Sequence, residues 1–303
     1  MKYLLLLCIS YFYLSANAHV FVYHRFGDDR HQSTNTTLKE LEKEFQYFKD
    51  HGYKVVPMMD IVNKLKNNQE VPDNWVAFNI DDSYKSFYEN GLPLFKKYNY
   101  PFTLFVYVEA TQKKYGDFMN WEQIKDASKY GEIALHSYAH KHLTKQNSKD
   151  IYEDTKLSYE IFEEKMGFKP KGYVYPYGEY DQRVKDVIKQ FDFEYIANQS
   201  SGSVNKKSDR FDINRVALVG EVNLKEKLRY KTLDATWIEP KVTPKDGILK
   251  RIKVKVNPNI KNIKLYLSGY GWQDIKVKNG IIDVILNKKL KFSRNRVAIS
   301  PNY

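Results

Sequence analysis

Short apolar runs alternate with helix-like segments from residue 19 to about residue 220, and few folds are compatible with this order. The strand-like runs are 20–24, 54–58, 75–80, 102–108, 132–136, 172–175, 195–198 and 215–219. Helical patterns separate most of them, for example at 83–98, 121–130 and 148–166. This alternation predicts an α/β fold of about seven βα units, in which parallel strands form a closed or nearly closed barrel inside a layer of helices.

One of these helices has a clear start and finish. Thr37-Leu-Lys-Glu40 is a capping box, in which a threonine caps the first turn and a glutamate follows three residues later. Leu41, Phe45 and Phe48 then fall on one helical face before Gly52 ends the pattern. The segment therefore predicts an amphipathic helix that packs against the sheet.

Reactive side chains follow four of the strand-like runs. In chain order they are His24, the pair Asp81 and Asp82, His136, and the segment 175–177. In (β/α) barrels the carboxyl ends of the strands meet at one mouth, where the chemistry takes place. We therefore expect these residues to converge although they are far apart in the sequence.

Two features of these residues indicate a metal site. His136 and His140 are four residues apart, a spacing that places two side chains on one side of a helical turn and lets them share a metal ion. Asp81 and Asp82 are adjacent carboxylates, whose mutual repulsion costs energy. A cation beside one of them removes that cost and leaves the other free to act as a base.

Three segments carry a family resemblance. Ile80-Asp81-Asp82-Ser83, His136-Ser137-Tyr-Ala-His140 and Tyr175-Pro176-Tyr177-Gly178 resemble, in this order, the first three motifs of the polysaccharide deacetylases, carbohydrate esterase family four with its NodB-type domain. The opening Tyr23-His24 resembles the branch that deacetylates poly-N-acetylglucosamine exopolysaccharides. The resemblance covers about residues 19 to 220 and implies a distorted (β/α) barrel.

The resemblance implies a role for each matching residue. Asp82, His136 and His140 match the metal ligands, and Asp81 matches the general base. Ser137, Tyr175, Pro176, Tyr177 and Gly178 match the substrate-binding segments, with the Tyr177 backbone amide helping to bind the oxyanion. Two imidazoles and one carboxylate leave positions open on a divalent ion, which is typical of catalytic zinc; nickel or cobalt would suit the same ligands.

Three departures from the family pattern matter. Ser83 stands where the first motif usually has glycine, a change that we expect a loop to tolerate. Val174 stands where the third motif usually has an arginine that steadies the base, so we expect Asp81 to be held by another group, either Arg25 or Arg215. The late histidine that serves many members as the general acid is also missing, since no histidine follows His142.

The leaving amine still needs a proton, so the general acid must come from elsewhere. The candidates are His142, His24, Glu179 and Asp81 acting twice. His24 is our first choice as the second catalytic residue, because a strand end directs it at the mouth. Packing or hydrogen bonding at this position is the structural alternative for His24.

The C-terminal part differs in charge and in pattern. Residues 221–303 hold 19 Lys and Arg against 7 Asp and Glu, whereas the preceding residues hold 30 of each. Apolar runs at 251–256, 263–267 and 281–286 are separated by turn signals, and Lys278-Asn-Gly280 is typical of a hairpin turn. We therefore predict a basic, β-sandwich-like accessory domain over 223–303, after a barrel domain over 19–222. Trp237, Tyr270 and Trp272 would form its core or a sugar-binding platform.

The N-terminal segment 1–18 predicts a signal peptide. Lys2 precedes an apolar stretch, and Ala16-Asn17-Ala18 is typical of a cleavage site. The alternative is a retained membrane anchor, although the apolar segment is too short to span a bilayer. After cleavage no transmembrane segment is expected, the single cysteine Cys8 is lost, and the protein is expected to be periplasmic or secreted. A nucleic-acid partner is then excluded, so the basic charge favours anionic glycans, lipid head groups or solubility.

Together these observations predict a metal-dependent enzyme that removes acetyl groups from an exported N-acetylated polysaccharide, with an exopolysaccharide ahead of peptidoglycan. Two alternatives stay open. The first is a catalytically weak or inactive glycan-binding protein on the same fold. The second is a deacetylase of peptidoglycan or of a non-sugar acetamide. Nothing in the sequence indicates an oligomeric state.

Overall fold

The structure is a computed structural model that describes residues 17–292 and 294–301 of the 303-residue chain. The expected signal segment 1–18 lies outside the described residues, except for Asn17 and Ala18. No helix in the described part of the chain has the length and apolar character needed to cross a bilayer.

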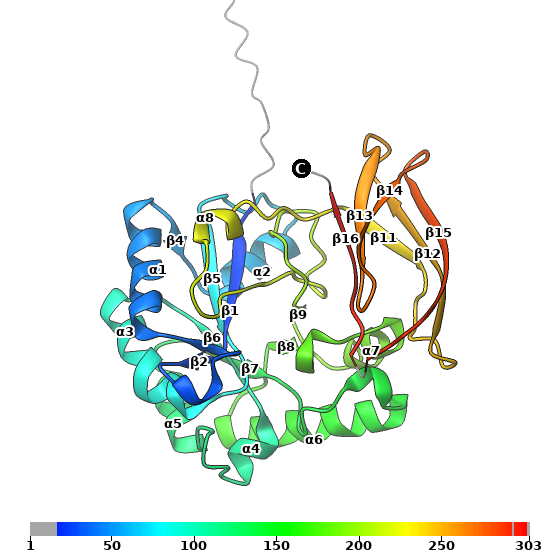
Figure 1. Ribbon diagram of the computed structural model, residues 1–303. Helices are drawn as coiled ribbons and strands as arrows, with labels where there is room; N and C mark the ends of the chain where they lie inside the picture. Colours follow the sequence, from blue (N-terminus) through cyan, green and yellow to red (C-terminus); the bar gives the residue numbers. More distant parts are fainter. Residues whose placement is uncertain (1–16, 293, 302–303) are drawn as a thin grey trace, which may run out of the picture.

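A parallel sheet of eight strands forms the centre of the larger part, in the order β10-β1-β5-β6-β7-β8-β9 with β4 added beside β5 (Figure 1). The strands are β1 His19–Tyr23, β4 Lys54–Val55, β5 Trp75–Ile80, β6 Thr103–Val106, β7 Glu132–Leu135, β8 Gly172–Val174, β9 Tyr195–Ala197 and β10 Val216–Ala217. The α/β class and the parallel strands predicted from the sequence are confirmed.

The sheet curls into a partial barrel. Its outer strands are β9 and β10, which share no ladder; a single parallel bridge joins Ala197 of β9 to Ile213, just before β10. Val216 of β10 in turn pairs with Phe21 of β1. The short stretch 213–217 therefore touches both edges, and the barrel is distorted and incompletely closed, as the family resemblance implies.

Helices cover the outside of the curled sheet (Figure 1). They are α1 Leu38–Asp50, α2 Met58–Lys66, α3 Leu92–Tyr98, α4 Val108–Gln112, α5 Trp121–Ala127, α6 Ser148–Met166, α7 Gln182–Ile188 and the short α8 Leu224–Lys227. Short elements connect them: β2 Arg25–Phe26, β3 Asn35–Thr36, a π-helical turn Phe87–Gly91, and 3₁₀ turns at Asp29–His31, Leu143–Lys145 and Pro176–Gly178.

Helix α1 shows how the sequence pattern produces the layers. The Thr37 side chain accepts a hydrogen bond from the Glu40 N–H, so the predicted cap is present. Leu41, Phe45 and Phe48 are buried, and the last two rings pack against Phe78 of β5. The predicted apolar face therefore joins the helix layer to the sheet.

Two local predictions need correction. The strand expected over 54–58 is only Lys54–Val55, because Pro57 has no N–H for a ladder and helix α2 begins at Met58. The helix expected over 83–98 becomes regular only at Leu92, after the π-helical turn Phe87–Gly91. Gly91 ends this turn, and Pro93 lies in the first turn of α3, where its missing N–H is tolerated.

The C-terminal module consists of two three-stranded antiparallel sheets, β11-β12-β15 and β14-β13-β16, around a shared apolar core. The strands are β11 Ala235–Glu239, β12 Ile248–Val256, β13 Asn262–Leu267, β14 Gly271–Lys276, β15 Ile281–Lys289 and β16 Val297–Pro301. Trp237 and Tyr270 pack against this core, whereas Trp272 is 55% exposed.

The turn at Lys278–Ile281 forms, but the predicted hairpin does not. Asn279 and Gly280 both have positive φ, at 50° and 74°, and Lys278 bridges Ile281, as in a two-residue hairpin turn. The strands on either side, however, pair elsewhere, β14 with β13 and β15 with β12. The turn thus links the two sheets, because each strand finds a longer partner in its own sheet.

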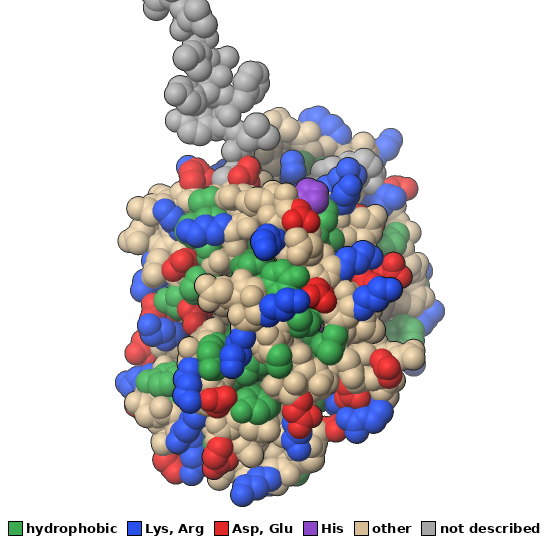
Figure 2. Space-filling view, turned by 90° about the vertical axis from the view of Figure 1, so that its left-hand side faces the viewer, with side chains coloured by type: hydrophobic (Ala, Val, Ile, Leu, Met, Phe, Trp, Pro, Cys, Tyr) green, Lys and Arg blue, Asp and Glu red, His purple; other side chains and the backbone are tan. Residues whose placement is uncertain are grey.

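Charge on the barrel side is mixed. On the face drawn in Figure 2, basic and acidic side chains are interspersed with apolar ones and form no large field of one sign. This agrees with the balanced charge of the first 220 residues.

Candidate active site

Asp82, His136 and His140 meet at the carboxyl ends of β5 and β7. Asp82 Oδ1 lies 3.2 Å from His136 Nε2 and 3.1 Å from His140 Nε2, and the two Nε2 atoms are 3.2 Å apart. The ligand atoms of all three residues lie within 4.8 Å of one another, and Asp82 and His136 are buried. The predicted convergence of these three side chains is therefore present.

The donor atoms suit a divalent cation. His136 Nδ1 lies 2.9 Å from the carbonyl oxygen of Val174, which only accepts, so Nδ1 carries a proton and Nε2 of the neutral ring turns a lone pair toward Asp82. Asp82 Oδ1 is buried and has no hydrogen-bond partner among the described residues. A cation would satisfy these facing electron pairs, and the set of two imidazoles and one carboxylate is that of a catalytic site with open positions.

The pKa shifts within the triad of Asp82, His136 and His140 also favour a bound cation. Burial by itself would raise the pKa of Asp82, but His136 and His140 beside it hold that pKa well below its usual value. Burial would lower the pKa of His136, whereas the carboxylates of Asp82 and Asp81 raise it. These surroundings therefore favour a charged Asp82 carboxylate next to a positive partner.

The loops that carry the motifs adopt unusual backbone conformations. Asp82, Ser83, Ser137, His140 and Tyr177 all have positive φ, between 49° and 70°. Residues other than glycine rarely adopt this region, and when they do they cluster at functional sites. Ser83 tolerates the conformation that the family usually gives to glycine, and its hydroxyl donates to the Asp82 carbonyl oxygen.

Arg215 holds Asp81. Its Nη1 lies 2.7 Å from Asp81 Oδ1 and its Nη2 2.8 Å from Asp81 Oδ2, and both side chains are wholly buried. Burial would raise the pKa of Asp81, but the guanidinium lowers it, so the carboxylate stays ionised. Of the two arginines that the sequence left open, the structure selects Arg215, from the segment that closes the barrel.

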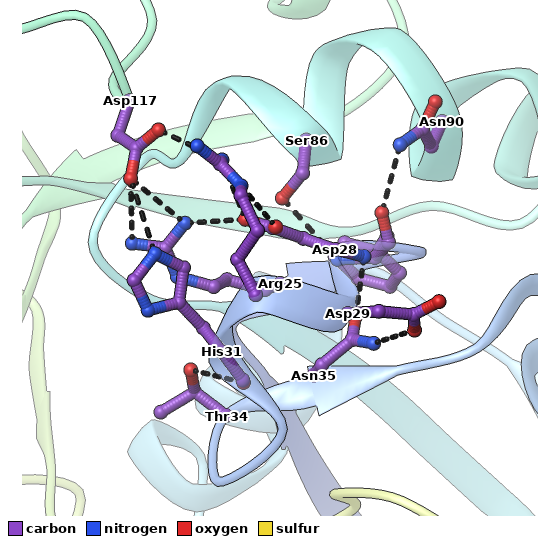
Figure 3. A network of polar contacts seen from close by, with 11 residues as sticks. Arg25, Asp28, Asp29, His31, Thr34, Asn35, Ser86, Asn90 and Asp117 are labelled. Atoms are coloured by element: carbon purple, nitrogen blue, oxygen red, sulfur yellow. Dashed lines mark hydrogen bonds and ion pairs between the residues drawn. The ribbon is translucent and has the colours of Figure 1, made fainter.

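Arg25 serves a different network, shown in Figure 3. Its Nη1 donates to Asp28 Oδ2 at 2.6 Å and to Asp117 at 3.3 Å, and its guanidinium lies 3.6 Å from the centre of the Tyr84 ring. Arg30 also contacts both carboxylates. Asp28, His31 and Asp117 are close enough to form a second metal site, but two guanidinium groups already neutralise these carboxylates.

His24 follows β1 and is half-buried. Its Nδ1 is buried without a hydrogen-bond partner among the described residues. It is near enough to Asp81 for a positive charge on its ring to lower the pKa of that carboxyl. Nothing in the structure assigns it to proton transfer, which stays a prediction.

The third motif lines the mouth through Tyr177. The Tyr177 ring stacks on His142 at 4.2 Å between centroids and meets the His140 ring edge-on at 4.5 Å. Tyr175 and Pro176 are buried beneath the loop, where Tyr175 stacks on Tyr180. These contacts give the two buried residues a packing role, and their contact with substrate stays a prediction.

Gly178 and Ser137 shape the loops. Gly178 has φ of 64°, and a Cβ atom there would lie 2.6 Å from the Cβ of Gln199. The Ser137 hydroxyl is buried and accepts a hydrogen bond from the His140 N–H at 3.0 Å. Both contacts position neighbouring groups, and binding of substrate by either residue stays a prediction.

His142 and Asp81, at the mouth, each contact a side chain that the sequence analysis did not pair with them. His142 Nδ1 pairs with Glu179 Oε2 at 2.9 Å, so two candidates for the general acid contact each other. Gln199 Nε2 lies 3.4 Å from Asp81 Oδ2. Gln199 belongs to none of the motifs, but it follows β9, so its place at the end of a strand brings it to the mouth as it does Asp81.

Comparison with known proteins finds a matching family model and several relatives. The family model described as polysaccharide deacetylase matches residues 68–196, which include all three motifs. A poly-beta-1,6-N-acetyl-D-glucosamine N-deacetylase of Escherichia coli K12 is 23% identical over 242 residues, covering 66% of this chain and 36% of the relative. The chain thus spans about a third of that relative. A protein of the same name from Staphylococcus aureus MRSA252 is 23% identical, covering 65% of this chain and 72% of the relative.

Solved structures show the same fold. A Streptococcus pyogenes deacetylase, PplD, in complex with acetate superposes with a TM-score of 0.66 at 17% identity, covering 71% of this chain and 99% of that one. IcaB from Ammonifex degensii superposes with a TM-score of 0.61 at 23% identity, covering 68% of this chain and 93% of that one. These similarities establish the curled parallel sheet as a shared architecture.

Proposed function

Because the chain belongs to the polysaccharide deacetylase family, we propose that it is a metal-dependent N-deacetylase that hydrolyses the acetamide groups of an N-acetylated polysaccharide. The observation that carries the proposal is the meeting of Asp82 Oδ1 and the two histidine Nε2 atoms, each 3.1–3.2 Å from the others, next to an ionised Asp81. Such a group of donors, set beside a base, is what metal-assisted hydrolysis of an acetamide requires.

Asp82, His136 and His140 would hold the divalent ion, with zinc as our choice and nickel or cobalt as equivalents for these ligands. When bound, the ion supplies Lewis-acid polarisation of the acetamide carbonyl and acidifies water. Binding would also remove the repulsion between the facing donor atoms.

The chain's own residues would perform the proton transfers. Arg215 keeps Asp81 ionised and oriented. Asp81 takes a proton from the attacking water while the water oxygen bonds to the acetyl carbon. The backbone N–H of Tyr177 stabilises the developing oxyanion. As the carbon–nitrogen bond breaks, His24 donates a proton to the leaving nitrogen, and acetate and a free amine result.

The substrate class rests on the relatives. Several curated relatives are named for the deacetylation of poly-beta-1,6-N-acetyl-D-glucosamine. We therefore propose an N-acetylglucosamine exopolysaccharide as the substrate, and a periplasmic or secreted location, where such a polymer is found. The buried pair of Arg215 with Asp81 supports an active enzyme over an inactive glycan-binding protein, because it replaces the arginine missing from the third motif.

Acetate release from N-acetylglucosamine oligomers tests the proposal. We expect release by the wild-type protein, loss of it with a chelator, and recovery on adding metal. Asp81→Asn should lower kcat by at least about a hundredfold, because it removes the base. Asp73→Asn, at an exposed carboxylate outside the mouth, is the control and should behave as wild type. Glycan binding without acetate release would instead support the binding protein.

A further inference from the structure

Two separate segments of the C-terminal module contact one short stretch of the barrel, residues 177–182. After β11, the Lys241 carbonyl oxygen accepts from the Gln182 N–H at 2.8 Å, and the Thr243 N–H donates to Asp181 Oδ2 at 3.4 Å. Between β15 and β16, Arg294 reaches the same stretch. Figure 1 shows the lower ends of these strands beside α7, where the stretch leads into the helix. The module is therefore attached at this loop.

Arg294 makes two polar contacts there. Its Nη2 donates to the Tyr177 carbonyl oxygen, and its Nε lies 3.4 Å from Glu179 Oε1 in an ion pair. The Glu179 side chain is 12% exposed, and its other oxygen, Oε2, pairs with His142 at 2.9 Å. One carboxylate thus joins the loop of the histidine motif to the C-terminal module.

Tyr177, whose carbonyl oxygen accepts the hydrogen bond from Arg294, has an unfavourable backbone conformation. Tyr177 has φ of 59° and Gly178 follows with φ of 64°, so two consecutive residues are left-handed. A tyrosine persists in this region only where surrounding contacts determine it. The bond from Arg294 to the Tyr177 carbonyl is one such contact, and it comes from outside the barrel.

The conformation of this loop bears directly on the proposed chemistry. The Tyr177 ring lies against His140, a ligand candidate, and against His142. Gly178 packs on Gln199, whose amide nitrogen lies 3.4 Å from Asp81 Oδ2. A shift of the loop would therefore move groups that contact both the candidate ligands and the base.

We propose that Arg294 is a positioning residue for the catalytic mouth, through which the C-terminal module holds the Tyr177–Glu179 loop in its working conformation. This inference rests on the proposed deacetylase function. It makes the basic module a part of the catalytic machinery, because a loop with two left-handed residues depends on the guanidinium of another module to stay in place.

The test compares Arg294→Ala and Arg294→Lys with Arg296→Ala in the full chain. Arg296 is exposed in the same segment, and its hydrogen bonds with Ser268 are made by its backbone, so its replacement removes the same charge without touching the loop. We expect Arg294→Ala to lower kcat on N-acetylglucosamine oligomers about tenfold with little change in KM. Arg294→Lys should fall between, since one ammonium cannot make both contacts.

Amide hydrogen exchange over residues 176–182 provides a readout independent of activity. Exchange should quicken in Arg294→Ala and stay as in wild type in Arg296→Ala, with equal metal content in all three. Should Arg294→Ala fail to fold, Arg294→Lys carries the test alone. Wild-type kcat and exchange in the Arg294 variants would overturn the inference, and so would a rise in KM alone. An inactive wild-type protein would instead refute the deacetylase function.

Discussion

At the scale of single residues, the ion pair of Arg215 with Asp81 is wholly buried, and burial makes each partner depend on the other. Both carboxylate oxygens are bonded, at 2.7 and 2.8 Å, and Arg215 Nε donates to the Asn198 carbonyl oxygen at 2.8 Å. The desolvation of both charges is offset only while the pair stays intact. The pair is therefore a structural requirement of the barrel as well as a device for keeping the base ionised.

Arg215→Met should destabilise the fold by about 3–5 kcal/mol, because it leaves the Asp81 carboxylate buried without a partner. The measurement is the free energy of unfolding in denaturant, with metal removed from both proteins. The double variant Arg215→Met with Asp81→Asn serves as the control and should recover part of the loss. Equal stability of Arg215→Met and wild type would show that the buried pair does not form.

At the scale of elements, α1 places a carboxyl group inside the core together with its aromatic face. Glu44 is 3% exposed; its Oε2 accepts from the Tyr23 hydroxyl at 2.7 Å, while Oε1 has no partner among the described residues. Burial raises the pKa of Glu44 to about 7. The helix thus packs best with this side chain protonated.

This arrangement predicts a stability that depends on pH. The folded pKa of about 7 lies above the ordinary value of 4.5, so the folded protein binds a proton that the unfolded chain has released. The contribution is complete below about pH 4.5 and is lost as pH rises to about 7. The shift amounts to about 3 kcal/mol. Urea unfolding of wild type between pH 4.5 and 8 should show this decline.

Glu44→Gln should flatten that part of the profile and be more stable than wild type at pH 8, because its amide needs no proton. Asp50→Asn, at the exposed C-terminal end of the same helix, is the control and should leave the profile unchanged. If wild type and Glu44→Gln lose stability in parallel over this range, another group is responsible.

At the scale of the whole molecule, the candidate ligands tie distant parts of the sheet together. Asp82 follows β5, whereas His136 and His140 follow β7, and β6 lies between these strands. A cation held by all three would bind the folded state and not the unfolded chain. Metal binding should therefore raise the stability of the whole barrel.

We expect zinc to raise the midpoint of thermal unfolding, with a gain of about 2.7 kcal/mol when the free ion is at a hundred times its dissociation constant. A chelator should reverse the gain. His140→Ala and His136→Ala should show neither the gain nor bound metal while remaining folded. His51→Ala, at an exposed histidine at the end of α1, is the control and should respond as wild type. An unchanged midpoint in wild type would contradict the ligand assignment.

Local sequence patterns were enough to predict the order of the strands and helices and to name the candidate ligands. Buried apolar side chains recur along a helix or strand at a regular spacing, which a short stretch of sequence is enough to show. A strand that is followed by Asp81-Asp82 or His136 places those side chains at the mouth of any parallel barrel. The helix α6, Ser148–Met166, and the strand β5, Trp75–Ile80, were predicted to the residue for this reason.

The residues that support these candidate groups, by contrast, became known only from contacts in the folded protein. Arg215 lies 134 positions from Asp81, and Arg294 lies 117 positions from Tyr177. The sequence offered Arg25 and Arg215 equally, and no motif marked Gln199 or Arg294, although Gln199 follows a predicted strand. The same holds for the C-terminal module, where a hairpin-like turn joins two different sheets. Such pairings depend on how the sheet curls and on competition between distant partners, and neither leaves a periodic trace in the chain.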